Sequence, residues 1–194
     1  HGLYYTTHVG DRYVQVTSLP MVLAARPLWD LGGYRATLLL PMLGGIATAF
    51  AARPLARRLG DGEGWAAFWV IGLASPVAVY SLDLWEHSLG LALMGWAAVV
   101  LLDVVERRPV WWRGLVAGAL FGVAAAMRTE AFVYGFAMIG VACLVVAVGR
   151  RRSLPGAVGV GLASVGGVVL AFGANLALET AVLGEQIRST RTGG

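Results

Sequence analysis

The sequence contains two neighbouring apolar stretches, VWWRGLVAGALFGVAAAM at residues 110–127 and AFVYGFAMIGVACLVVAV at residues 131–148. Only Arg128, Thr129 and Glu130 lie between them. Each stretch is close to the roughly 20 mostly apolar residues that an α-helix needs to cross a membrane. They predict a pair of antiparallel membrane-spanning helices, and the expected fold class is therefore all-α, a polytopic transmembrane helix bundle.

The composition points the same way. Of the 194 residues, 58% are hydrophobic and 13% are charged, whereas an ordinary soluble domain has about 25% charged residues. This argues against a soluble enzyme and against a disordered chain. The net charge of +4 is too small and too scattered for a nucleic-acid partner. The single cysteine, Cys143, excludes a disulfide framework and a cysteine-based metal site.

Six stretches qualify as spans in all, and the second and third are short. They cover residues 34–52, 65–80, 88–102, 110–127, 131–148 and 154–183. The 34–183 region is thus expected to be a bundle of about six spans. The expected location is the plasma membrane, which for a bacterial protein is the inner membrane, with membrane lipid as a partner.

Arginines mark every second connection between these spans. Three triplets follow the first, third and fifth spans: Arg53, Arg57 and Arg58; Arg107, Arg108 and Arg113; and Arg150, Arg151 and Arg152. Because basic residues are enriched in cytoplasmic loops, these connections are predicted to be cytoplasmic. Residues 81–87 and 128–130 are then external.

The two ends of the chain fall on the external side in this topology. Residues 1–33 are polar and aromatic, with a mildly amphipathic part from Pro20 to Leu31. They are expected to form an external loop with a helix at the membrane surface. Residues 184–194 are expected to begin a later external loop, and the chain is interpreted as a fragment of a longer protein.

The external 81–87 segment carries three ionisable groups, Asp83, Glu86 and His87. If it is helical, Asp83 and His87 lie one turn apart on one face, with Glu86 beside them. Such a group is suited to a divalent cation, Mg or Mn, or to orienting an acceptor hydroxyl. The alternative is a solvated turn with no ligand.

Arg128 stands out because an arginine at the outer surface is unusual under the positive-inside bias. Its guanidinium is suited to gripping a phosphate through several N–H donors. The alternative is an Arg128–Glu130 pair that only ends a helix. Asn175 and Glu179, along with Glu130, are weaker site candidates because polar groups at membrane depth are costly unless they face protein or water.

Small residues recur at four-residue spacing in two of the stretches. One set is Gly114, Gly118 and Gly122, and the other is Gly159, Ala163, Gly167 and Ala171. Each set predicts a smooth stripe where another helix can approach closely, within this chain or in a dimer.

The order of several short segments resembles the GT-C superfamily of membrane glycosyltransferases. The likeness is to its bacterial branch related to protein O-mannosyltransferases and aminoarabinose transferases. The segments are GDRY at residues 10–13, LGGYRA at 31–36, AARPLARRL at 51–59, ASP at 74–76, and AG, GVA and MRTE within 117–130.

This resemblance implies transfer of a sugar on the outer face of the membrane, from a polyprenyl-phosphate-linked donor to a glycan, lipid or protein acceptor. It implies that Arg128 binds the donor phosphate, and that Asp83, Glu86 and His87 bind the acceptor or a metal. The family's catalytic base follows the first span, so it is expected N-terminal to His1, and Asp11 is too far along the loop for this role. The fragment itself is then expected to be inactive.

Two other functions remain open from the residues alone. One is a transporter or flippase of lipid-linked sugars, and the other is a non-catalytic membrane scaffold. The spans are almost free of charge and no repeat is visible. Both features favour chemistry at the surface over a path through the membrane.

Overall fold

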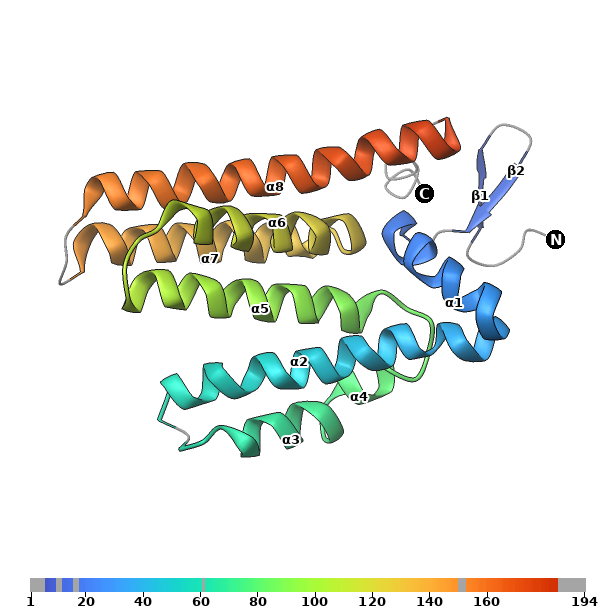
Figure 1. The fold of residues 1–194 in the computed structure, drawn as a ribbon, viewed down its shortest axis with the longest axis horizontal. Helices are drawn as coiled ribbons and strands as arrows, with labels where there is room; N and C mark the ends of the chain where they lie inside the picture. The colour runs from blue at the N-terminus through green and yellow to red at the C-terminus, as the bar shows by residue number, and fades with distance from the viewer. Residues whose placement is uncertain (1–5, 10–11, 16–17, 61, 150–152, 185–194) are drawn as a thin grey trace.

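The computed structural model describes residues 6–9, 12–15, 18–60, 62–149 and 153–184. Over these residues it contains eight helices and one antiparallel hairpin (Figure 1). The hairpin pairs β1 (Thr6–Val9) with β2 (Arg12–Gln15), and the sequence analysis did not expect it. The helices are α1 (Leu19–Thr37), α2 (Leu39–Arg58), α3 (Trp65–Leu73), α4 (Pro76–Tyr80), α5 (His87–Glu106), α6 (Trp111–Met127), α7 (Glu130–Val148) and α8 (Leu154–Leu183).

The predicted helix bundle is confirmed. The helices α2, α5, α6, α7 and α8 run side by side, α3 and α4 flank α2, and α1 lies at one end (Figure 1). Four of them, α2, α5, α7 and α8, are long and apolar enough to cross a membrane, fewer than the six spans predicted. The apolar α6 has 17 residues and is slightly shorter. This architecture fits a multi-pass membrane protein.

The closest helix pair is α6 with α8, and glycines make it possible. A Cβ added at Gly114 would lie 2.6 Å from the carbonyl oxygen of Val160, and one at Gly122 would lie 2.8 Å from that of Val168. The predicted stripe on α6 therefore serves packing within this chain. On α8 the predicted stripe contacts α6 at Gly167 and Ala171, since a Cβ at Gly167 would collide with the backbone of Leu115 and Ala119 and one at Gly122 would lie 2.8 Å from Cβ of Ala171. Its Gly159 lies outside the contact, because a Cβ there would meet nothing within 4 Å.

The predicted span at residues 65–80 is not one helix. It breaks at Ser75, whose backbone is extended (φ −130°, ψ 165°), between α3 and α4. Proline disfavours the helical conformation of the residue before it, and Pro76 follows Ser75 directly. The Ser75 hydroxyl accepts a hydrogen bond from the Val77 N–H at 3.2 Å and caps the new helix.

The first long helix begins later than predicted, at Leu39 instead of residue 34. Residues 34–37 belong to the end of α1, which is kinked at Gly32 and Gly33. Gly33 has φ 61°, a left-handed conformation that glycine adopts without steric cost. The kink lets α1 change direction before α2 starts, and α1 contains the predicted helical segment from Pro20 to Leu31.

Candidate functional site

Arg128 lies at the end of the bundle opposite to the connections after α2 and α5 (Figure 1). It follows the last residue of α6, where its backbone is extended (φ −137°, ψ 123°), and α7 begins two residues later. Its N–H donates to the Ala124 carbonyl at 2.7 Å. The chain therefore reverses direction within two residues, which fixes the position from which the Arg128 side chain departs.

The side chain of Arg128 lies against the first turn of α5. A Cβ added at Gly90 would lie 3.3 Å from Cδ and 3.5 Å from Cγ of Arg128. The absence of a side chain at Gly90 thus leaves the space that the arginine stem occupies. The Arg128 side chain is 26% exposed, so most of it is covered while part of it still reaches the surface.

The predicted pair between Arg128 and Glu130 is present but weak. Nη2 of Arg128 donates to Oε1 of Glu130 at 3.3 Å, and the Glu130 side chain is 60% exposed. Exposed pairs of this kind contribute only about 0–1 kcal/mol. A guanidinium has five N–H donors, and the contacts with described residues use one. The pair therefore leaves Arg128 able to bind a second anion.

His87, the first residue of α5, lies near Arg128. Its ring packs between Tyr80, with centroids 4.6 Å apart, and Trp85, with centroids 5.1 Å apart. The charges of Arg128, Glu86 and Glu130 are close enough to act on the imidazole. Its Nδ1 is buried and has no hydrogen-bond partner among the described residues.

Two connections far apart in sequence therefore meet at this end of the bundle. The 128–130 connection supplies Arg128 and Glu130, and the segment after α4 supplies Glu86 and His87. We call these four residues the Arg128 cluster. The sequence placed both segments on one side of a membrane but contained no signal for their proximity.

Asp83 does not join the cluster. It accepts hydrogen bonds from the Tyr34 hydroxyl of α1 at 3.4 Å and from the Leu84 N–H at 2.8 Å. These contacts hold the turn between α4 and α5. The sequence reasoning assumed a helix here, whereas residues 81–84 form a turn and α5 starts only at His87.

The predicted divalent-metal group at Asp83, Glu86 and His87 is therefore not assembled. Among the residues that the structure describes, no group of three or more His, Cys, Asp or Glu side chains is placed to hold a metal ion. Mg²⁺ and Mn²⁺ bind mainly through oxygen ligands with defined geometry.

Asn175 and Glu179 form a separate buried pair near the end of α8. Nδ2 of Asn175 donates to Oε1 of Glu179 at 2.9 Å. The two residues are only 8% and 4% exposed, and Oε2 of Glu179 has no partner within the described chain. Glu179 is thus enclosed by protein. No contact between described residues links this pair to Arg128.

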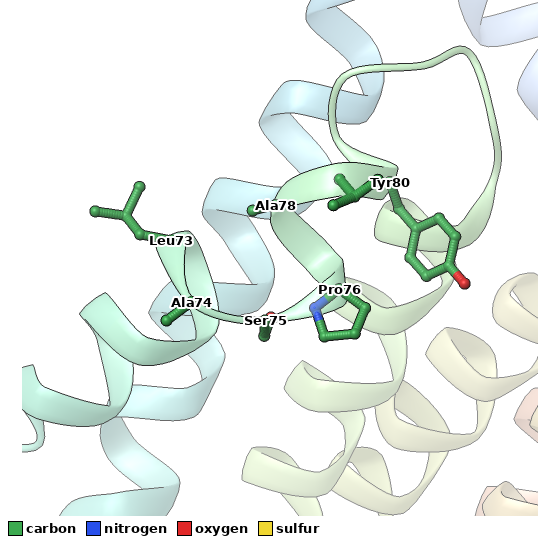
Figure 2. A pocket seen from close by; sticks show the side chains of 7 residues that line it. Leu73, Ala74, Ser75, Pro76, Ala78 and Tyr80 are labelled. Atoms are coloured by element: carbon green, nitrogen blue, oxygen red, sulfur yellow. The ribbon is translucent and has the colours of Figure 1, made fainter.

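An open cavity of about 520 Å³ lies at the break between α3 and α4 (Figure 2). Its lining runs from Leu73 to Tyr80, and Tyr80 also packs on the His87 ring. The cavity therefore borders the Arg128 cluster through that ring. The signal for it in the sequence is the Ser75–Pro76 pair, which lies inside the predicted 65–80 span.

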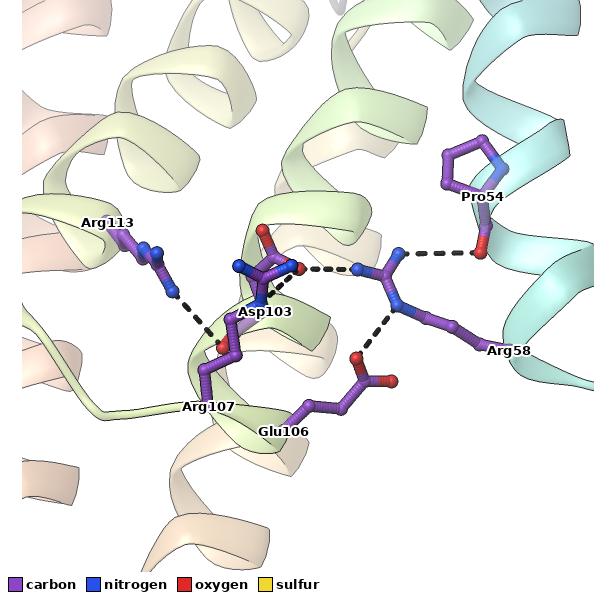
Figure 3. Close-up of polar contacts among 6 residues, drawn as sticks. All are labelled: Pro54, Arg58, Asp103, Glu106, Arg107 and Arg113. Atoms are coloured by element: carbon purple, nitrogen blue, oxygen red, sulfur yellow. Dashed lines mark hydrogen bonds and ion pairs between the residues drawn. The ribbon is translucent and has the colours of Figure 1, made fainter.

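The opposite end of the bundle holds a network around Arg58 (Figure 3). Arg58 pairs with Asp103 and, at 3.0 Å, with Glu106, and so ties α2 to α5. Arg107 and Arg113 are also at this end, while Arg150, Arg151 and Arg152 lie outside the described residues. The predicted segregation of arginines is thus present in the described connections between the long helices. Arg128 lies at the other end, where α1 also carries Arg26 and Arg35.

Comparison of the chain with known protein families, with curated proteins and with solved structures finds no match.

Proposed function

We propose that the chain is part of a membrane glycosyltransferase that takes a sugar from a polyprenyl-phosphate-linked donor. The transfer takes place on the external face, at the end of the bundle that carries Arg128. One observation supports this most: the stem of Arg128 packs beside Gly90, and its guanidinium is only weakly paired with Glu130. His87 lies within electrostatic range of this guanidinium. The order of the sequence segments that resemble the GT-C superfamily adds to it.

The proposed role of Arg128 follows from the charge that develops during transfer. When the bond between the sugar and the phosphate breaks, the leaving phosphate gains negative charge. A fixed guanidinium stabilises that charge through charge-assisted hydrogen bonds. The donor phosphate would displace Glu130 from a weak contact, and the exposed Glu130 side chain has room to move aside.

The polyprenyl chain and the acceptor would occupy different parts of this end. The prenyl chain would lie along the apolar surfaces of the long helices, in the lipid. His87 and Glu86, on the side of the cluster that borders the cavity at the α3–α4 break, would contact the acceptor. We assign no metal to the site because the predicted ligands do not come together.

The test is Arg128→Gln in the full-length protein. Membranes that contain it would be given polyprenyl-phosphate donors with a radiolabelled sugar, and transfer of the label to acceptor would be measured. Loss of one preorganised donor to a developing oxyanion costs about 100-fold to 1,000-fold in rate, so we expect a loss of about 100-fold. Arg26→Gln is the matched control, because Arg26 is an exposed arginine of α1 whose pair with Asp30 lies on one helix. Equal activity of the two variants would refute the phosphate role.

A transporter or flippase of lipid-linked sugars is the second candidate. It is favoured by the buried Glu179, whose Oε2 has no partner among the described residues, because buried ionisable groups of membrane proteins often belong to substrate paths. The same assay separates the two functions. A transferase moves the label to a new acceptor, whereas a flippase moves the intact labelled lipid across the membrane.

A further inference from the structure

An apolar groove lies at the arginine-rich end of the bundle, away from the Arg128 cluster. It is enclosed by α2, α5 and α7 and has a volume of about 620 Å³. Ligand sites in proteins usually measure about 300–1,000 Å³. Every residue that lines the groove is apolar except Arg58 and Glu106, so its natural occupant is a hydrocarbon with a polar group at one end.

The length of the groove matches one leaflet of a bilayer. Its three walls are helices that are each long and apolar enough to cross a membrane. On α5 the lining runs from Ala98 to Glu106, and on α7 from Ala137 to Val145. Each range rises about 12 Å along its helix, and one leaflet of the hydrocarbon core is about 15 Å deep. The groove is thus long enough to hold most of one acyl chain of the leaflet at the arginine-rich end.

The charged network at this end of the groove has an excess of positive charge (Figure 3). Oδ1 of Asp103 pairs with Arg58 and also lies 3.9 Å from Nε of Arg107. Arg113 donates from Nη1 to the backbone carbonyl of Asp103 at 3.4 Å. Among the described residues of this network, three guanidinium groups therefore share two carboxylates, those of Asp103 and Glu106. This imbalance favours an anionic head group over a zwitterionic one.

We propose that the groove binds one acyl chain of an anionic phospholipid and that Arg107 holds its phosphate. Arg107 is suited to this role because its side chain is 68% exposed and its pair with Asp103 is the longest in the network. Arg58, at 20% exposed, is held by α2 and α5 and forms the end of the groove. The bound lipid bridges α2 and α7 across α5.

The shape of the groove argues against a helix of another protein or of a second copy. A helix docked along the bundle would contact α5 and α7 over their full lengths, not over about two turns. It would also bring further backbone or side chains against the charged Arg58–Glu106 pair. A flexible chain with a charged end fits both the short length and the basic end.

The first test compares two lipids that have the same acyl chains, phosphatidylglycerol and phosphatidylcholine. The full-length protein would be released from mixed micelles in a mass spectrometer, and the retained lipids would be counted. We expect retained phosphatidylglycerol to dominate. Arg107→Gln should lower that preference about fivefold, the effect of one basic residue near an anionic surface. Equal retention of both lipids by the unaltered protein would overturn the proposal.

The second test fills the groove. Ala137→Trp puts a large side chain among the lining residues of α7, and Gly140→Trp is its control, because a Cβ at Gly140 meets nothing within 4 Å. Lipid retention should fall at least fivefold in the first variant and stay unchanged in the second. Equal retention by both, or a dimer that only Ala137→Trp dissociates, would contradict the lipid. Arg107→Gln tests the proposal independently if Ala137→Trp does not fold.

Discussion

Gly90 is a single residue on which the position of Arg128 depends, because its missing side chain leaves room for the arginine stem. The two residues come from different helices, and the stem of the arginine crosses α5 where a side chain would otherwise stand. Gly90→Leu keeps Arg128 in the chain but pushes its guanidinium away. Because misplacement by about 1 Å can reduce a rate by about 100-fold, we expect sugar transfer to fall by about that factor in the labelled-donor assay.

The control for this variant is Gly173→Leu, since a Cβ at Gly173 of α8 meets nothing within 4 Å. Thermal unfolding in detergent should be similar for both variants, because only flexible carbons of Arg128 lie near Gly90. Unchanged transfer by Gly90→Leu would mean that the position of Arg128 does not matter for the reaction.

At the scale of elements, the contact between α6 and α8 is the most sensitive to added volume. At Gly118 an added Cβ would collide with the backbone of Ser164, which cannot move without separating the two helices. Gly118→Leu should therefore lower the free energy of unfolding by about 3 kcal/mol, the upper end of overpacking costs. Denaturant titration in mild detergent measures this change.

Gly166→Leu provides the comparison on α8, because an added Cβ there meets nothing within 4 Å. Its unfolding free energy should stay within about 0.5 kcal/mol of that of the original chain, as for substitutions away from structural contacts. If the two substitutions destabilised the chain equally, helix packing at Gly118 would not be the cause.

The bounds of the helices also show which parts of the fold can be predicted from the sequence. The predicted span at 110–127 nearly coincides with α6, and the one at 131–148 nearly coincides with α7. Both predictions succeed because polar residues flank these two apolar stretches. The sequence predicts no break at Ser75 because residues 65–80 are almost all apolar, and hydrophobicity alone does not show where a chain stops being helical. Pro76 was the local signal for that break.

The site was harder to predict than the helices. Arg128 was found from its charge and its position, which are local properties. Its contact with Gly90 and its proximity to His87 depend on how α5 and α6 are placed side by side, and a single sequence does not record this placement. The metal prediction depended on helical spacing in a segment that forms a turn, so Asp83, Glu86 and His87 are not grouped as it required.

At the scale of the whole molecule, the two ends of the bundle should lie on opposite sides of a membrane. In a Cys143→Ser background, we expect a thiol placed by Leu82→Cys to react with an impermeant reagent added to intact cells. One placed by Leu59→Cys should react only after lysis. Both positions are well exposed, at 70% and 89%, and they lie on opposite ends of the bundle. Reaction of both thiols in intact cells would exclude this topology.

The shortness of α6 has a consequence for the surrounding lipid. Its 17 residues rise about 26 Å, less than the hydrocarbon core of about 30 Å, and exposed Trp111 and Trp112 anchor its other end. Because α6 is locked to the longer α8, it cannot tilt independently to correct the mismatch. If the bundle spans a bilayer, we expect the bilayer to thin beside Arg128. Local thinning would bring the membrane surface down to the level of Arg128. The phosphate of a lipid could then contact the guanidinium while its lipid chain stays in the membrane.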